Sequence, residues 1–460
     1  MTVFDERELK DQLFAQNAKD VYESIVQYDE EMVPIMKARG YTCIHSMERT
    51  VAFTFGEITF RRRRWKKGGE WVVPVDEKLG LSKNTRFSWE FMYQVACLST
   101  MMPYDKVIQV IQLTYHIRIT KPIVVKAVKL CDELLKEKAT YRFYGDEEAQ
   151  EKQPVDVIYI EGDGVMVKAS DQEDPSRNYD LSHFVIHTGS KKVGSNRFEL
   201  QGKKEFISLD NRLTRDQVLD YLYNHFDIKE ETILITNSDG GHGYTPYIFK
   251  EIAKALKVKR HEHFWDAYHV NQKLKLAFRP YAEELLDLAF QAIKQHDKEK
   301  LRTVLDTTEG LLSTEEEEEE FEHFKNKLLQ NFQYTKPANL RGLSSSGIGV
   351  MESQHRKVTY RMKKRGMYWT VLGAQTMSQM IILNYEDGLR ELFFGCWREE
   401  YEEMMELDDI TNVVLGKSKL YNKVYNKLYN SRFFKKVFFL LFFYRKYLHS
   451  GYLCAIILIK

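Results

Sequence analysis

Three carboxylates stand where a metal-dependent reaction on a phosphodiester would need them. Asp163 follows the apolar run VIYI between two glycines, Asp239 ends ILITNS before two more glycines, and Glu352 begins a helical segment after a Gly/Ser-rich linker. Divalent Mg²⁺ (or Mn²⁺) prefers oxygen ligands, and two such ions about 3.5–4 Å apart require carboxylates that converge from rigid elements. Glycines leave room for a metal or a phosphate backbone. The pattern predicts a catalytic, two-ion site at Asp163, Asp239 and Glu352, although each Asp-Gly alone is also typical of a turn.

Polar residues close to this pattern are auxiliary candidates. Asp266 and His269, in WDAYH, could order a substrate or tune a metal-bound water. A single histidine near an aromatic strand end is also a common packed, structural residue. His242, three residues after Asp239, is placed to contact DNA.

Two basic clusters indicate phosphate binding. The first, RRRRWKKGG (61–69), could instead be a charged strand edge that prevents aggregation. The second follows Glu352: six of the ten residues 356–365 are Lys or Arg. Helical spacing places Glu352, His355, Arg356, Thr359 and Lys363 on one face, although a solvated basic helix would show the same pattern. Lys121 and Lys126, in a predicted pair of helices, are further candidates. The candidate DNA contacts are therefore Arg61, Arg62, Arg63, Arg64, Lys66, Lys67, Lys121, Lys126, Arg356, Lys357, Arg361, Lys363, Lys364 and Arg365.

The elements that would position these residues follow from periodicity. Residues 51–60 alternate around a glycine as a β-hairpin does, and residues 88–138 have the spacing of consecutive helices, of which the last two could form a helix-turn-helix. From 154 on, three strands, a helix, a strand, a helix and a strand (HEHFWDAYHV) form an α/β pattern in which the first and fourth strands could be neighbours.

A charged helical stretch, 275–340, interrupts this pattern as an insertion would. Its acidic run, 315–320, is typical of a solvated helix face. We therefore divide the chain into six regions. They are an N-terminal helix with the basic hairpin (1–80), a helical region (81–150), the first part of the core (151–275), a helical insertion (276–344), the second part of the core (345–390) and a C-terminal helical region (391–460).

Composition sets limits on the functional class. The 460 residues are 43% hydrophobic and 29% charged with a net charge of +1, which argues against a uniformly basic protein but not against basic patches. Five separated cysteines without CxxC spacing argue against a zinc site and favour a reducing, cytoplasmic setting. The N-terminus has no apolar signal region. The Tyr/Phe/Lys-rich tail from about 417 contains apolar runs too short to span a membrane, and it suggests an altered reading frame or a degenerate terminus.

The motifs EGDGV, TNSDGGHGY, FWDAYH and ESQHRKVTYRMKKRGMYW, in this order, resemble bacterial insertion-sequence transposases of the Lre-two type, the uncharacterised protein family 0236, which is similar to Mutator-like DDE transposases. The resemblance covers roughly residues 45–385. It implies an RNase H-like mixed-sheet catalytic core with an all-helical insertion, Mg²⁺-dependent DNA cleavage and strand transfer, and Asp163, Asp239 and Glu352 as the metal-binding triad. Asp266 and His269 match the Mutator-type motif of Cys or Asp, two residues, then His.

The expected partners are double-stranded DNA, at element ends and target, and further copies of the chain in the DNA complex. Two alternatives stay open. A non-catalytic DNA-binding remnant or regulator would keep the basic clusters without needing metal, and an RNase H-like host nuclease would lack end-specific binding.

Overall fold

The computed structural model describes residues 5–145, 152–170, 178–195, 197–279, 283–312 and 314–414. The chain divides into two compact units, Met1–Phe394 and Gly395–Lys460. Of the second unit, the helix α15 (Trp397–Val414) is described. The atypical tail expected from about 417 lies outside the described residues. No described helix has both the length and the hydropathy that crossing a membrane requires.

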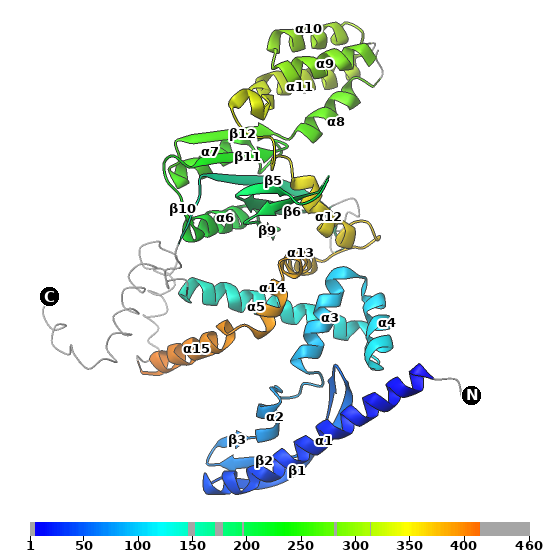
Figure 1. The fold of residues 1–460 in the computed structure, drawn as a ribbon, viewed down its shortest axis with the longest axis vertical. Coiled ribbons are helices and arrows are strands. Elements are labelled where there is room, and N and C mark those ends of the chain that lie inside the picture. The colour runs from blue at the N-terminus through cyan, green and yellow to red at the C-terminus, as the bar shows by residue number, and fades with distance from the viewer. Residues whose placement is uncertain are drawn as a thin grey trace, which may run out of the picture. The chain divides into compact units, whose positions relative to one another are not determined.

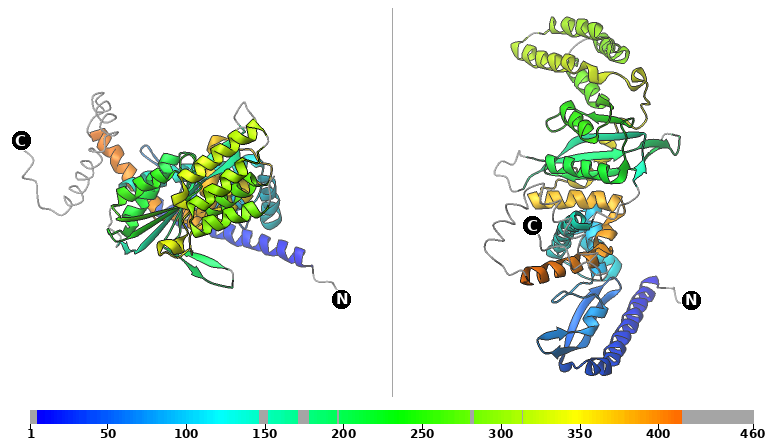
Figure 2. Two further views of the ribbon diagram at one scale, coloured as in Figure 1. Left: turned by 90° about the horizontal axis from the view of Figure 1, so that it is seen from above. Right: turned by 90° about the vertical axis from the view of Figure 1, so that its left-hand side faces the viewer.

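The N-terminal region combines one long helix with an antiparallel hairpin. Its elements are α1 (Glu6–Ala38), β1 (Thr42–Phe53), β2 (Gly56–Lys67), β3 (Glu70–Val72) and α2 (Pro74–Lys78). The hairpin predicted around residues 51–60 is confirmed, with Phe53 paired to Gly56 at the turn. Helix α1 lies along the hairpin (Figures 1 and 2), where Ile25 packs with Val51, Phe53 and Phe60.

Three helices follow, as the spacing predicted: α3 (Trp89–Met101), α4 (Tyr104–Tyr115) and α5 (Lys121–Gly145). Pro103 is the N-cap of α4 and Pro122 lies in the first turn of α5, where a missing N–H has no helical partner to lose. Lys121 and Lys126 are both exposed on α5. DNA binding by the pair α4–α5 stays a prediction.

A mixed five-stranded sheet forms the centre of the first unit (Figure 1). The strands lie in the order β12 (Arg260–Trp265), β11 (Ile233–Ser238), β5 (Val157–Lys168), β6 (Asn178–His187) and β9 (Lys204–Ser208). The strands β12, β11 and β5 are parallel, whereas β6 and β9 continue the sheet antiparallel. The sequence prediction that the first and fourth strands are neighbours is confirmed by the β5–β11 pair. Two short pairs lie outside this sheet: β4 (Gln153–Pro154) with β10 (Phe226–Asp227), and β7 (Gly189–Lys192) with β8 (Phe198–Gln201).

The two faces of this sheet differ in chemistry because strand side chains alternate. On one face, Ile158, Ile160 and Phe184 pack against helices α6 (Asn211–His225) and α7 (Pro246–Leu256) in the main apolar core. Burying each such side chain contributes about 1.5–3 kcal/mol. The other face carries polar groups, among them Glu161 and Asp163, and contacts α12 (Met351–Met362) and α13 (Val371–Tyr385), which α14 (Gly388–Phe394) follows.

The helical insertion has its own core. Its elements are α8 (Ala267–Ala277), α9 (Glu283–Gln295), α10 (Lys298–Glu309), α11 (Glu315–Gln330), η1 (Phe332–Thr335) and η2 (Ala338–Arg341). Leu274, Leu301, Leu305 and Leu328 meet in one apolar cluster. The acidic run 315–320 is exposed, as expected for a solvated helix face. One expectation was wrong: HEHFWDAYHV is not a single strand, because β12 ends at Trp265 and Asp266 caps α8.

Candidate functional site

The strand register brings three aspartates level at one edge of the sheet. Asn237 of β11 pairs with Glu161 of β5 on one side and with Phe264 of β12 on the other. Two residues further along each strand come Asp163, Asp239 and Asp266. Parallel neighbours lie about 4.8 Å apart. Asp163 lies within β5, whereas Asp239 and Asp266 directly follow the ends of β11 and β12, and the register places the three residues at one level. From the sequence, Asp163 and Asp239 were predicted to be catalytic and Asp266 auxiliary.

The Asp163 carboxylate is held in an unfavourable position for a charge. Burial, and then the neighbouring Asp239 carboxylate, raise the pKa of Asp163 to about 6. One hydrogen bond partly offsets this, since the backbone N–H of Gly164 donates to Asp163 Oδ1 at 2.7 Å. The Asp239 carboxylate in turn accepts the N–H of Gly241 at 2.7 Å, which closes the turn after β11. A cation between the two carboxylates would relieve their mutual repulsion.

Glu161 is a site residue that sequence reasoning missed. Its buried carboxylate accepts three backbone N–H groups, from Gly349 at 2.7 Å, Val350 at 2.8 Å and Met351 at 3.1 Å. These are donors at the N-terminus of α12, which have no partner within the helix. Burial raises the pKa of Glu161 to about 7, against the opposing effect of these hydrogen bonds. The Glu161 cap therefore ties the helix that carries Glu352 to the strand that carries Asp163.

Glu352 itself is exposed in the first turn of α12. The residue of this helix that reaches Asp163 is His355, whose Nδ1 lies 3.8 Å from Asp163 Oδ2. The predicted face is divided between two environments, because His355 is buried whereas Glu352 and Arg356 are exposed. Met351, His355, Val358 and Met362 form the buried side of the helix, because they follow the spacing of 3.6 residues per turn.

The carboxylates at the sheet edge do not form a preformed metal site. Within the described ranges, no group of three or more His, Cys, Asp or Glu side chains has the geometry to hold a metal ion. The donor set at the sheet edge nevertheless consists of carboxylate oxygens, which suit Mg²⁺ or Mn²⁺.

A buried polar network lies behind Asp163. His355 stacks on His183 with ring centroids 5.2 Å apart, and His183 Nε2 lies 3.0 Å from Glu205 Oε2. The Glu205 carboxylate is also paired with Lys357 and, at 2.9 Å, with Lys203. Burial lowers the pKa of His355 to about 3, so this ring is neutral at physiological pH. The network fixes α12 against β5, β6 and β9.

Asp266 and His269 form a local pair at the start of α8. The Asp266 carboxylate accepts the His269 N–H at 3.1 Å, and His269 Nδ1 lies 3.3 Å from the same oxygen. Asn237 Nδ2 donates to Asp266 Oδ2 at 3.2 Å and lies 3.4 Å from Glu161 Oε2. The nearby Asp266 carboxylate raises the pKa of His269, with further contributions from Asp163 and Asp239. Asp266 is therefore linked through Asn237 to Glu161, and the auxiliary role of Asp266 and His269 stays a prediction.

Several basic residues predicted to contact DNA are instead internal partners. Arg361 is 1% exposed and donates to the carbonyl oxygen of Ser99 at 2.7 Å, so its guanidinium is not available to a phosphate. Lys357 is paired with the buried Glu205. For these two residues the prediction was wrong, because a helix that packs on a sheet also turns some of its basic side chains inward.

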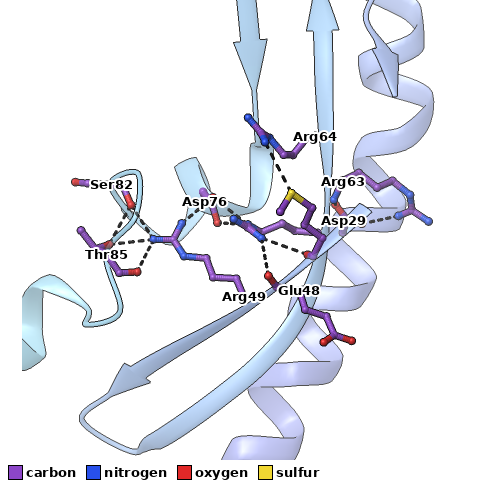
Figure 3. A network of polar contacts seen from close by, with 10 residues as sticks. Asp29, Glu48, Arg49, Arg63, Arg64, Asp76, Ser82 and Thr85 are labelled. Carbon is purple, nitrogen blue, oxygen red and sulfur yellow. Dashed lines mark hydrogen bonds and ion pairs between the residues drawn. The ribbon is translucent and has the colours of Figure 1, made fainter. Parts of the chain in front are cut away.

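The hairpin arginines are similarly engaged (Figure 3). Arg62 pairs with Asp76 at 2.8 Å, and Arg63 pairs with the buried Asp29 at 2.6 Å. Arg64 lies over the Trp71 ring at 4.9 Å. The structure therefore assigns Arg62 and Arg63 first to joining β2 to α2 and α1. The predicted contacts that stay exposed are Arg61, Lys67, Lys121, Lys126, Arg356, Lys363 and Lys364. Partly exposed are Lys66, over Trp71 at 5.2 Å, and Arg365, over Tyr360 at 4.5 Å.

His242 is exposed in the turn between β11 and α7, and it lines a cavity beside that turn. It lies apart from the Asp266–His269 pair in the chain and makes no contact with it among the described interactions. Its predicted contact with DNA stays a prediction.

Comparison with known proteins places the chain in a family. Residues 4–395 match the uncharacterised protein family UPF0236. A UPF0236 protein from the vanSb 3′ region of Streptococcus gallolyticus is 30% identical over 374 residues, which cover 80% of this chain and 79% of that protein. A UPF0236 protein of Caldanaerobacter subterraneus is 22% identical over 404 residues, which cover 85% of this chain and 78% of that protein.

Among solved structures, the Drosophila P element transposase strand transfer complex aligns at 12% identity over 69% of this chain and 82% of that chain. The TM-score of 0.23 is too low to establish a shared fold. The sequence matches, in contrast, span most of both partners, and on their strength the chain belongs to the uncharacterised protein family UPF0236.

Proposed function

We propose that the chain is a DDE-type transposase, which cleaves DNA at the ends of an insertion sequence and joins those ends to target DNA. The observation that carries the proposal is the alignment of Asp163, within β5, with Asp239, directly after the parallel neighbour β11, where burial and then the Asp239 charge raise the pKa of Asp163. Repelling carboxylates held by rigid strands are typical of sites that receive divalent cations.

The topology of the sheet supports an RNase H-like core. Three successive antiparallel strands, β5, β6 and β9, are followed by β11 and β12, which add in parallel to the free side of β5. The helical insertion between Asp239 and Glu352 agrees with the arrangement that the family resemblance implies.

In this proposal Asp163 and Asp239 would hold the ions, and Glu352 would complete the set from the start of α12. Bound Mg²⁺ or Mn²⁺ would activate the attacking hydroxyl and stabilise the charge that develops on the phosphate. Glu161 keeps the first turn of α12 beside β5 by capping its free N–H groups. His269, paired with Asp266, is the side chain of the site best placed to hold a proton near neutral pH.

The exposed basic side chains would bind the DNA backbone. Arg356, Lys363 and Lys364 follow Glu352 on the outer side of α12 and its C-terminal end. Lysine and arginine on one ridge can neutralise several phosphates without reading sequence. Oligomeric assembly on paired element ends and a cytoplasmic location belong to the same proposal.

The test is cleavage of a duplex that carries the element end, defined by inverted repeats flanking the gene. Asp163→Asn, Asp239→Asn and Glu352→Gln should each lose cleavage and strand transfer while binding the end as before. The control is Asp216→Asn, which removes an exposed carboxylate of α6 and should leave the activity unchanged.

Three results would contradict the proposal in different ways. Retained cleavage in the Asp239→Asn variant would return Asp239 to the role of a turn residue. End binding by the unaltered protein without any metal-dependent cleavage would favour the regulator. Equal cleavage of end DNA and scrambled duplex would favour a host nuclease.

A further inference from the structure

A cavity of about 720 Å³ opens beside the turn that begins at Asp239. It lies between the start of α6 and the turn before α7. Its lining includes Asp180, Asn211, Arg212, Arg215, His242 and Tyr247. This volume is in the usual range for pockets that hold a small ligand.

The cavity is built on a fixed floor. Ser182 Oγ accepts hydrogen bonds from Asn211 Nδ2 at 2.7 Å and from the hydroxyl of the buried Tyr244 at 2.8 Å. Gly243 adopts a φ of +92°, and a Cβ there would lie 3.0 Å from Asn211 Nδ2. The turn therefore packs closely on α6, and the walls of the cavity are held by hydrogen bonds.

The rim of the cavity presents cationic and aromatic groups to solvent. Arg212 is exposed and Arg215 is half-buried, and among the described residues neither has a carboxylate within ion-pairing distance. Arg215 Nε donates to the Asn211 carbonyl oxygen at 3.4 Å. The Tyr247 ring is 68% exposed, and His242 is exposed beside it. Unpaired guanidinium groups suit a phosphate, and exposed rings suit the face of a base.

The cavity adjoins the candidate site directly. Its Asp180 lies against Gly164, the neighbour of Asp163, because a Cβ on Gly164 would collide with the Asp180 carboxylate. Asp239 begins the same turn that carries His242 and Tyr244. A DNA strand whose phosphate lies at Asp163 and Asp239 would therefore have its next nucleotides within reach of this cavity.

We infer that the cavity is a binding site for one unpaired nucleotide of the DNA strand that adjoins the cleaved phosphate, an inference that rests on the proposed function. Arg212 and Arg215 bind its phosphate, and Tyr247 with His242 stacks on its base. Asp180 and Asn211 face the hydrogen-bonding edge of the base, where a carboxylate accepts an exocyclic amine. A base inside a duplex is stacked and paired, so its hydrogen-bonding edge can reach Asp180 and Asn211 only when the base is unpaired.

The experiment compares two DNA probes with the full-length protein in EDTA, which prevents metal-dependent cleavage. One probe is a blunt element-end duplex, and the other carries a three-nucleotide single-stranded extension at the cleaved end. Fluorescence anisotropy gives the affinity ratio of the two. The variants are Arg212→Ala/Arg215→Ala and, with unchanged charge, Tyr247→Ala. The charge-matched control is Lys294→Ala/Lys298→Ala, which removes two exposed lysines of the insertion.

We expect the unaltered protein to prefer the extended probe, and both cavity variants to reduce that preference about tenfold or more, as the removal of one base stack or one phosphate interaction would. A 5-iodouracil in the extension should crosslink to the peptide that contains His242 and Tyr247. Equal weakening of both probes would show only a general charge effect, and unchanged preference would exclude the cavity; either result overturns the inference.

A free deoxynucleoside monophosphate is the third probe. If it binds in an Arg212- and Arg215-dependent manner as tightly as the extended duplex, the occupant is a free nucleotide and the assignment to DNA is wrong. Because no arm of this experiment measures cleavage, a failed cleavage test of Asp163 and Asp239 and a failed cavity test remain distinguishable.

Discussion

The Glu161 carboxylate accepts the Gly349 N–H at 2.7 Å, across 188 residues of chain. It also accepts the N–H groups of Val350 and Met351, so a neighbouring strand supplies the side-chain acceptor at the start of the helix. Helix α12 lacks a local cap, since the Val350 side chain can accept no hydrogen bond. The position of Glu352 relative to Asp163 therefore depends on a third carboxylate, in β5.

Substituting Glu161→Ala should release the start of α12. The N–H groups of Gly349, Val350 and Met351 would lose their acceptor, and of these three residues only Met351 is buried. An unsatisfied buried N–H costs about 1–3 kcal/mol, whereas the exposed start of the turn can fray to water. We expect amide hydrogen exchange of residues 349–353 to accelerate about tenfold or more, as measured by mass spectrometry. The matched control is Asp210→Ala, which removes the side-chain cap of α6 and should accelerate exchange there but not in α12. Unchanged exchange at 349–353 would show that the cap does not hold the helix.

Removing the charge of Asp239 should stabilise the metal-free protein. Asp163 titrates near 3.8 when unfolded and near 6 when folded, so the unfolded state loses its proton first as pH rises. The free energy of unfolding therefore falls between about pH 3.8 and pH 6, and the full loss is present above about pH 6. Asparagine keeps the acceptor for the Gly241 N–H but removes the repulsion. We expect Asp239→Asn to raise the free energy of unfolding by roughly 1 kcal/mol at pH 7.5 in EDTA, and by nothing below about pH 4.

Urea unfolding at the two pH values measures this difference, with Asp216→Asn as the control for removal of an exposed carboxylate. An equal gain at both pH values would mean that charge repulsion at Asp163 is not its source. A decrease at pH 7.5 would mean that Asp239 stabilises the fold, contrary to its proposed role.

The sheet was predictable from the sequence because its signals are local. Apolar runs such as VIYI and ILIT, each ending in polar residues and glycine, are typical of buried strands, and the pairing of the first and fourth followed from connection rules. The role of Glu161 was not predictable in this way, since its partners begin at Gly349 and no spacing relates them.

The orientation of α12 was only partly predictable. The six basic residues of 356–365 predicted a helix exposed to DNA. Met351, Val358 and Met362, however, follow helical spacing and mark the buried side of the same helix. His355 lies on that stripe, which predicts that it points inward. The inward pairing of Lys357 depends on Glu205 of β9, a contact that only the tertiary structure supplies.

Neutralising Asp266 should lower the pKa of His269. The Asp266 carboxylate raises that pKa above 6.5, so the pair contributes stability that is fully present below pH 6.5 and is lost as pH rises through the pKa of the folded state. Asparagine also caps helices well, so Asp266→Asn should leave α8 intact. NMR titration of the histidine ring signals should show His269 shifted toward 6.5, with His296 in the insertion unchanged. An unchanged pKa of His269 in this variant would mean that Asp266 does not control the protonation of His269.

Basic residues on the two sides of α12 should respond differently to substitution. Arg356→Ala and Lys363→Ala remove exposed charges, so each should weaken DNA binding. Each should also reduce the slope of log affinity against log salt by about 0.9 for each phosphate that is no longer neutralised. The free energy of unfolding should change by less than about 0.5 kcal/mol.

Arg361→Ala, in contrast, removes a buried group that holds the Ser99 carbonyl and packs over Trp369 at 5.2 Å. It should lower stability by about 2–4 kcal/mol and leave the salt slope unchanged at temperatures where the variant is folded. Arg361→Lys tests the same point with the charge kept: because lysine lacks the planar group that spans both partners, it should still destabilise. Equal salt slopes for the Arg356 and Arg361 variants would mean that the outer side of α12 does not face the DNA backbone.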